Sequence, residues 1–482
     1  MHHQRMAFLG LCIGFFIVMM DTTTVPLIYT SLIADFEVTP ENAAWVNNSY
    51  LITYASFLLL SGRLGDSYNR KNLIVSALLI LAVGALISGC GQTLIQVIAG
   101  RALMGLGSAL LTPQSMAYIA IIYAQNGRGK ALGIWGAVAG IATAAGPVVT
   151  QFFLQISDWR WVMWINIPVT LLGLVIIIKY LPVTSKKGLK GREFLINGAF
   201  GFSISAVILG VQLIHGIKGT GSMGGLLLLL GGGILVWLLR YELRYRSEYI
   251  LPIEIWYNRT FLRTCLLSGL LGFGLTAFYL PLAFLIEVRM NFGPLAISIV
   301  MITMALANAL IGPISGHLSD KFTPEVIVCY GLSAFAFAVF LLGGIGFFAP
   351  GGTTGLIVII IAMAIAGTGT GLAFAPLANL ALRRVSLTAV GQAAAFFNVS
   401  RQSMSAFGGV AIAALFDYVV SQSQIEGTSH IAEQFQPYSP VIYSATLACF
   451  LLIALCLSSG AWLSNRYSST NQNVTQIRRM KQ

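Results

Sequence analysis

Charged side chains are scarce in this sequence. They make up 9% of the 482 residues, whereas hydrophobic residues make up 57% and the mean hydropathy is +0.82. An ordinary globular domain carries about 25% charged residues. A water-soluble protein this apolar would expose large adhesive patches, so most of its surface must face lipid. The composition therefore excludes an ordinary soluble protein and predicts an all-α polytopic membrane protein.

Catalytic and metal-binding patterns are also missing. There is no Walker loop for ATP, no nucleophile–His pairing, no zinc-ligand spacing, and no C-x-x-C pair. The sequence therefore predicts no enzyme activity, no cofactor and no metal site, and the energy for any transport must come from an ion gradient. The six cysteines are expected to be small buried hydrophobic residues: Cys12, Cys90, Cys265, Cys329, Cys449 and Cys456.

A cleavable signal peptide is not expected either. The basic start at Arg5 is followed by an apolar run that exceeds the hydrophobic region of a signal peptide and lacks a small-residue cleavage site. The first apolar segment is therefore expected to stay in the mature protein as a transmembrane helix.

What the sequence has in abundance is apolar segments long enough to cross a bilayer, which takes about 20 residues each. Short turns separate the segments and leave no room for a soluble domain between them. We predict fourteen spans, with limits at 6–30, 44–63, 73–92, 95–122, 131–155, 161–181, 195–215, 223–243, 261–286, 294–316, 326–348, 354–380, 391–420 and 440–463.

The basic residues predict how these helices are oriented. With a cytoplasmic N-terminus, nearly all lysines and arginines between the spans fall on the cytoplasmic side, and only Arg160, Lys218 and Arg289 fall outside. Both termini are therefore predicted to be cytoplasmic, in a plasma membrane of the bacterial inner-membrane type. The same distribution accounts for the net charge of +12 without a nucleic-acid partner.

Two stretches of the sequence are weakly similar to each other. SGRLGDSYNRK (Ser61–Lys71) follows the second span and SGHLSDKFTPE (Ser315–Glu325) follows the tenth, and both contain S-G-x-L-x-D. With the seventh and eighth spans set aside, the two copies occupy matching places in two six-helix halves. The domains expected are six-helix bundles in 1–185 and 251–465, two additional peripheral helices in 186–250, and a cytoplasmic tail in 466–482.

This plan resembles the major facilitator superfamily, which has parallel halves with binding sites near the bilayer midplane between them. GRLGDSYNRK resembles the loop motif of that superfamily, with Asn69 in place of its second glycine. RALMGLG (Arg101–Gly107) resembles its fourth-helix motif. GIWGAVAGIATAAGP (Gly133–Pro147) resembles the glycine-rich fifth-helix motif of antiporters, although Thr150 and Gln151 replace the usual Gly-Gly.

Two further stretches resemble the fourteen-spanner drug:proton antiporter family. They are WRWVMWINIP (Trp159–Pro168) and the first-helix stretch that contains Asp21 and Val25. In the first helix, Pro26 and Thr30 replace an asparagine and a proline of the family pattern. The resemblance covers nearly the whole chain and implies a multidrug exporter of six, two and six helices.

Asp21 and Arg101 are ionisable residues inside predicted spans. At 1.5 Å per residue, Asp21 lies about 23 Å from the inner boundary and Arg101 about 9 Å from the outer one, in the outer half of a core about 30 Å thick. Burial favours the neutral acid and a nearby arginine favours the carboxylate, so Asp21 is the predicted proton carrier and Arg101 its partner. A structural ion pair, or a cap at a helix break near Pro26, is the alternative.

The repeated motif and the glycine-rich helix are candidates for gating. Asp66 can accept hydrogen bonds from a helix N-terminus and Arg70 can reach an acid, which would hold the cytoplasmic side shut. The glycines let another helix approach closely and so prevent a proton leak. The alternatives are a solvated topogenic charge cluster and ordinary small-residue packing. The predicted gating set is Gly62, Arg63, Asp66, Arg70, Lys71, Gly136, Gly140, Gly146, Pro147 and Asp320.

Aromatic and amide side chains are the candidates for a substrate cavity, because no acidic residue besides Asp21 lies near the middle of a span. An apolar wall with few polar groups suits amphipathic molecules, and aromatic faces can hold one cation. We therefore predict neutral, zwitterionic or monocationic lipophilic substrates, with divalent cations poorly handled. The candidates, any of which can instead pack against neighbours or lipid, are Tyr29, Asn47, Tyr50, Tyr54, Gln114, Tyr118, Tyr279, Asn308, Asn379, Phe397 and Asn398.

The sequence accordingly predicts a monomeric proton-coupled secondary transporter that exports lipophilic small molecules, with protons and the lipid bilayer as its partners. A dedicated transporter of one metabolite or solute, by export or symport, is the alternative, because both need the same gating residues. A membrane sensor without transport is disfavoured, since the chain has gating motifs but no soluble output domain.

Overall fold

The computed structural model describes residues 2–123, 127–183, 191–216, 221–245, 250, 252–286, 292, 294–348, 353–383, 385–386, 389–425 and 440–480. Most of these residues are helical, and none of them forms a strand. The chain divides into two compact units. Unit 1 comprises Met1–Asn126, Ile141–Leu262 and Ala381–Val399, and unit 2 comprises Gly127–Gly140, Arg263–Leu380 and Ser400–Gln482.

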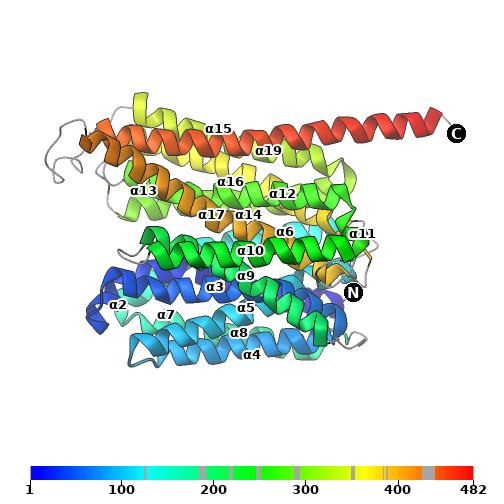
Figure 1. Ribbon diagram of the computed structural model, residues 1–482, viewed down its shortest axis with the longest axis horizontal. Helices are drawn as coiled ribbons and strands as arrows, with labels where there is room; N and C mark the ends of the chain where they lie inside the picture. The colour runs from blue at the N-terminus through cyan, green and yellow to red at the C-terminus, as the bar shows by residue number, and fades with distance from the viewer. Residues whose placement is uncertain are drawn as a thin grey trace. The chain divides into compact units, whose positions relative to one another are not determined.

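Unit 1 holds the N-terminal helices, and the axes of α3, α4, α5 and α8 lie roughly along the same line of the view (Figure 1). Its elements are α1 (His2–Thr24), η1 (Val25–Ile28), α2 (Tyr29–Phe36), α3 (Pro40–Ser67), α4 (Arg70–Gly89), α5 (Leu94–Ile122), α7 (Arg160–Trp164), α8 (Asn166–Tyr180), α9 (Gly191–Gly216), α10 (Gly221–Tyr245) and α11 (Ile253–Trp256). Within this unit α9 packs along α3, and α10 packs along α9.

Unit 2 is built around C-terminal helices, and α19 (red in Figure 1) lies along α15. The helices of this unit are α12 (Arg259–Ala277), which begins in unit 1, α13 (Tyr279–Phe284), α14 (Pro294–Lys321), α15 (Pro324–Phe348), α16 (Thr353–Leu382) and α19 (Pro440–Met480). Helix α19 continues to Met480, through most of the segment expected as a tail.

Two long helices are shared by the units. Helix α6 (Arg128–Ile156) gives its first half to unit 2 and its second half to unit 1, whereas α17 (Val390–Ile425) gives its first turns to unit 1 and the rest to unit 2. The expected division into 1–185, 186–250, 251–465 and 466–482 follows sequence halves instead of contacts, and it stays a prediction. Helices α9 and α10 belong by contact to unit 1.

Local sequence explains where several helices begin. Asn69, which replaces a glycine of the loop motif, caps α4 because its Oδ1 accepts the Lys71 N–H at 3.0 Å. Thr93 and Gln96 form a reciprocal capping box at the start of α5. The substitution at Asn69 therefore preserves the turn between α3 and α4 with a different residue.

The first predicted span is interrupted in the structure. The expectation was one helix over 6–30, but α1 ends at Thr24 and the 3-10 turn η1 follows, with Pro26 in its first turn. Proline lacks the N–H that an α-helix interior needs, which explains the interruption. Val25 and Ile28 of this turn are buried in an apolar cluster with Val46, Val97, Trp159, Val162 and Met163.

The described residues contain twelve helices that are long and apolar enough to cross a membrane, and the count of fourteen stays a prediction. The predicted spans 44–63 and 391–420 do form the long helices α3 and α17, but neither belongs to the twelve. Asparagine and serine residues recur in both helices and lower their hydropathy.

Candidate functional site

A buried ion pair joins α1 to α5. Arg101 Nη1 lies 2.5 Å from Asp21 Oδ2, and the side chains of these residues are 0% and 2% exposed. Arg101 Nε also donates to the Val46 carbonyl oxygen of α3 at 3.3 Å, and the guanidinium carbon lies 4.5 Å from the centroid of the Tyr50 ring. The structure thus brings together the two ionisable residues that the sequence singles out, with α3 as the third wall.

The ion pair uses only part of its hydrogen-bonding capacity. Asp21 Oδ1 and Arg101 Nη2 are buried, and neither has a hydrogen-bond partner among the described residues. A buried polar atom left unsatisfied costs about 1–3 kcal/mol.

Helix α6 contacts α1 directly beside Asp21. Thr23 Oγ1 donates to the Thr143 carbonyl oxygen of α6 at 3.2 Å. Pro147 lacks the N–H that would bond to this carbonyl in a regular helix, so the proline makes the oxygen available to α1. A Cβ on Gly146 would meet Thr23 Oγ1 and the Met20 carbonyl oxygen, so glycine is needed for this close approach.

The loop motif forms what we call the Asp66 cluster: Asp66, Arg70 and Gln114 with the first turn of α17. Asp66 accepts the backbone N–H groups of Gly391 at 3.0 Å and Gln392 at 2.8 Å, so its carboxylate caps α17. Arg70 pairs with Asp66, and both side chains are about 5% exposed or less. Arg70 also donates to Gln114 Oε1 at 3.0 Å. The first turn of α17 is therefore held by a buried, charged cluster.

Two glycines of α3 allow this cluster to form. A Cβ on Gly62 would meet Ala395 and the backbone of α17, and a Cβ on Gly65 would overlap the Gln114 side chain. Gln114 Nε2 donates to the Ser61 carbonyl oxygen at 2.6 Å, which ties α5 to α3. Side chains at either glycine would separate the helices.

Unit 2 contains the second copy, which we call the Asp320 cluster: Asp320, Arg128 and Asn379 with the first turn of α6. Asp320 accepts the backbone N–H groups of Gly129 at 2.8 Å and Lys130 at 3.0 Å. Arg128 Nε donates to Asn379 Oδ1 at 3.0 Å. Asp320 is exposed, and no ion pair among the described residues includes it.

The remaining gating candidates have separate surroundings. Lys71 Nζ donates to a carbonyl oxygen at the end of α8 and does not join the Asp66 cluster. Gly136 faces the Phe374 ring, and Gly140 faces the backbone of α14. Arg63 contacts α9, as described below.

The candidate cavity residues make contacts at several separate places in the structure. Gln114 and Asn379 belong to the Asp66 and Asp320 clusters. Tyr50 stacks on Tyr54 with ring centroids 5.9 Å apart, and its hydroxyl donates to Ser108. The others are half-buried Tyr29 and Asn47, buried Tyr118 and Phe397, exposed Tyr279, Asn308 bonded to Thr370, and Asn398 bonded to the Ala394 carbonyl oxygen.

A groove of about 620 Å³ lies in unit 2 between α15 and α19. Its lining is mostly apolar and includes Cys329, Phe337, Phe340, Leu455 and Trp462. None of the candidate cavity residues lines this groove.

One polar cluster was not assigned a role from the sequence, although its motif was noticed. Arg160 pairs with Asp158 at 2.7 Å and with Asp35 of α2 at 2.9 Å. Trp159 Nε1 also donates to Asp35 at 3.2 Å. The W-R-W stretch thus ties the end of the interrupted first span to α7. The sequence signal that could have identified this cluster is Asp35, an acidic residue shortly after the first predicted span.

Long apolar helices that bury an ion pair are typical of a membrane protein with a functional site between its helices. The sequence profile of the Major Facilitator Superfamily matches residues 11–409, so the chain belongs to that superfamily. The all-helical facilitator fold and the absence of enzyme function predicted from the sequence are confirmed, because proteins of this family are transporters.

Several transporters of known sequence are similar to this chain. The uncharacterized MFS-type transporter Rv1250 of Mycobacterium tuberculosis is 27% identical over 84% of this chain and 69% of its own length. The riboflavin transporter RibZ of Clostridioides difficile is 26% identical over 67% and 70%. The puromycin resistance protein pur8 of Streptomyces alboniger is 27% identical over 86% and 84%.

A solved structure shares the fold. The human organic anion transporter MFSD10 aligns with a TM-score of 0.66 over 96% of this chain and 98% of its own chain. At 13% sequence identity this likeness supports the fold alone.

Proposed function

We propose that this chain is a proton-coupled secondary transporter that exports lipophilic, neutral to monocationic small molecules by alternating access. The observation that carries the proposal is the Asp21–Arg101 pair, in which Asp21 keeps one buried oxygen without a hydrogen-bond partner among the described residues. When Asp21 binds a proton, its attraction to Arg101 falls and α1 is released from α5.

The proton step is linked to gating through neighbouring contacts. Asp21 and Thr23 lie on the same helix, and Thr23 bonds to α6. Helix α6 begins at the Asp320 cluster, so a shift of α1 acts on a helix whose other end is capped by a carboxylate. In this proposal, release of the Asp66 and Asp320 clusters opens the cytoplasmic side.

The topology we propose has fourteen spans and cytoplasmic termini in a bacterial inner membrane. Helices α3 and α17 supply the two spans beyond the twelve apolar ones, since their lengths of 28 and 36 residues exceed the bilayer requirement of about 20. Their greater polarity suits helices that line a solvated pathway.

Relatives support two substrate classes. Pur8 is named for puromycin resistance and other relatives for multidrug or lincomycin resistance, which favours export of lipophilic compounds. RibZ is named as a riboflavin transporter, so a dedicated transporter of one metabolite is the second candidate. A resistance screen separates them, because only the first predicts tolerance to many unrelated compounds.

The coupling is tested with Asp21→Asn in everted vesicles. We expect proton-driven efflux of a lipophilic cation to fall at least about tenfold, which corresponds to 1.4 kcal/mol, while expression is unchanged. Asp21→Glu keeps a titratable group and serves as the conservative control. Wild-type efflux by Asp21→Asn, still responsive to a pH gradient, would show that another residue carries the proton.

A further inference from the structure

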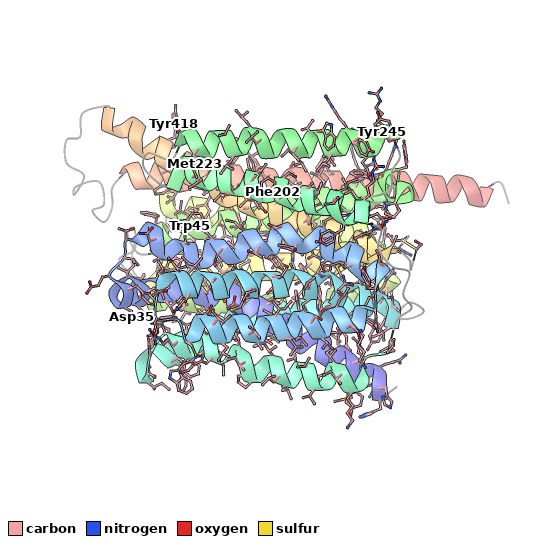
Figure 2. All side chains as sticks on the ribbon, turned by 60° about the horizontal axis from the view of Figure 1, so that its bottom comes forward. Asp35, Trp45, Phe202, Met223, Tyr245 and Tyr418 are labelled. Atoms are coloured by element: carbon pink, nitrogen blue, oxygen red, sulfur yellow. The ribbon has the colours of Figure 1, made fainter. Side chains whose placement is uncertain are left out.

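Helix α10 buries few side chains, yet one of them is an acid. Only Gly224, Gly231, Leu238 and Glu242 of this helix are buried. Figure 2 shows Met223 and Tyr245 at opposite ends of α10, with Asp35 and Trp45 toward the Met223 end. Glu242 lies one turn before Tyr245. A helix with few buried side chains thus keeps a carboxylate inside the protein at one end, which calls for a specific partner.

Hydrogen bonds through Ile250 and Gln392 connect Glu242 to Asp66. Glu242 Oε1 accepts the backbone N–H of Ile250 at 2.9 Å. The Ile250 carbonyl oxygen accepts from Gln392 Nε2 at 3.4 Å, and the Gln392 backbone N–H donates to Asp66. Glu242, Ile250 and Gln392 are all buried. A continuous run of hydrogen bonds therefore joins the end of α10 to the carboxylate that caps α17.

A second link to the Asp66 cluster comes from α9, which packs along α10; we call these two helices the α9–α10 hairpin. Glu193, in the first turn of α9, faces Arg63 of the loop motif: Arg63 Nη2 lies 2.8 Å from Oε1, and Nε lies 3.3 Å from Oε2. This two-point geometry fixes both side chains, which are 17% and 15% exposed. Arg63 lies three residues before Asp66, so Glu193 holds the same end of α3.

The hairpin is attached to α3 along its length as well. Ser56 and Ser205 share a hydrogen bond, and a Cβ on Gly201 would overlap the Ser56 carbonyl oxygen. Gly210 and Gly224 in turn bring the backbones of α9 and α10 together. Because these contacts are close-packed, a displacement of α3 is passed to the hairpin.

We propose that the α9–α10 hairpin controls the opening of the Asp66 cluster, with Glu193 and Glu242 as positioning residues. Glu193 fixes the end of α3 that carries Asp66, and Glu242 fixes the first turn of α17 that Asp66 caps. The role of this control in transport rests on the proposed function, whereas its effect on the Asp66 cluster does not.

Hydrogen–deuterium exchange of the lipid-embedded full chain tests this without transport. The amides of Gly391 and Gln392 are bonded to Asp66, so exchange in 390–399 reports opening of the Asp66 cluster. We expect Glu193→Gln and Glu242→Leu each to raise exchange there at least about threefold. Glu242→Gln keeps an acceptor for Ile250 and should exchange like the wild type.

The molecule provides its own control. The amides of Gly129 and Lys130 are bonded to Asp320, and these residues belong to unit 2, whereas the hairpin belongs to unit 1. Exchange in 128–132 should be unchanged in every variant. A rise there equal to that in 390–399 means general destabilisation and overturns the proposal, as does unchanged exchange in 390–399.

A charge swap separates positioning from simple loss of packing. Arg63→Glu alone and Glu193→Arg alone should both raise exchange in 390–399, and the double variant should restore it. The same variants should alter turnover at constant KM. If Asp21→Asn keeps proton-driven transport, the proposed function fails, yet the exchange results still decide the role of the hairpin.

Discussion

Asp66 and Asp320 make the same contact in their units but in different surroundings. Each accepts the N–H groups of the second and third residues of a helix, α17 for Asp66 and α6 for Asp320. Asp66 is buried and paired with Arg70, whereas Asp320 is exposed. The position of Arg70 in the first motif is taken by Pro324 in the second.

The difference teaches that the repeat preserves the cap and not the ion pair. A carboxylate at a helix N-terminus is favoured by about 0.3–1 kcal/mol even when exposed. A buried ion pair is different, because removing one partner leaves an uncompensated charge and costs about 3–5 kcal/mol. The Asp66 cluster should therefore have the larger influence on opening and closing.

The largest effect is expected from Asp66→Ala, compared with Asp320→Ala. Asp66→Ala leaves Arg70 buried without its carboxylate, so turnover should fall more than about tenfold, whereas Asp320→Ala should lower it about twofold to threefold. The measurement is transport by equal amounts of purified protein in proteoliposomes. Equal losses of turnover in the two variants would contradict this prediction, because they would show that the two clusters affect transport equally.

An intermediate effect is expected from the amides that support each cluster. Gln114→Leu removes an acceptor from Arg70 and a donor from the Ser61 carbonyl in a fully buried place, at a cost of about 1–3 kcal/mol. Asn379→Leu removes an acceptor from Arg128, which is half-exposed and can bond to water. Thermal unfolding in detergent should therefore show a larger drop in melting temperature for Gln114→Leu. The reverse order would mean that the Asp320 cluster contributes more to stability than the Asp66 cluster.

Only some residues of these clusters could be predicted from the sequence. The repeated S-G-x-L-x-D identified Asp66 and Asp320, and the buried charges identified Asp21 and Arg101. The helix ends that the aspartates cap were not predictable, because Gly391 and Gly129 act through backbone N–H groups that carry no side-chain signal. Gln114 and Asn379 were assigned to a substrate cavity because a buried amide suits either role.

The span count shows the same limit of composition. The sequence predicted fourteen spans, and twelve of the described helices are apolar enough to cross a membrane, whereas α3 and α17 are more polar because they carry cluster residues and their neighbours. The interruption of the first span followed from Pro26, which was noticed only as a departure from a family pattern. The link from Glu242 to Asp66 passes through the backbone of Ile250, and only coordinates can reveal such a contact.

The smallest effect is expected from giving the Asp320 cluster the cation it lacks. Pro324→Arg places a guanidinium at the start of α15, as Arg70 is placed at the start of α4. Because Asp320 is exposed, the new pair is worth about 0.2–1 kcal/mol and is screened by salt. We expect turnover in proteoliposomes to fall by no more than about twofold at low salt and to recover at high salt. Asp320→Ala combined with Pro324→Arg removes the acceptor and is the control, so the salt dependence should disappear. A large, salt-independent loss in Pro324→Arg alone would instead indicate that Pro324 itself shapes the turn before α15, since proline is well suited to the first position of a helix.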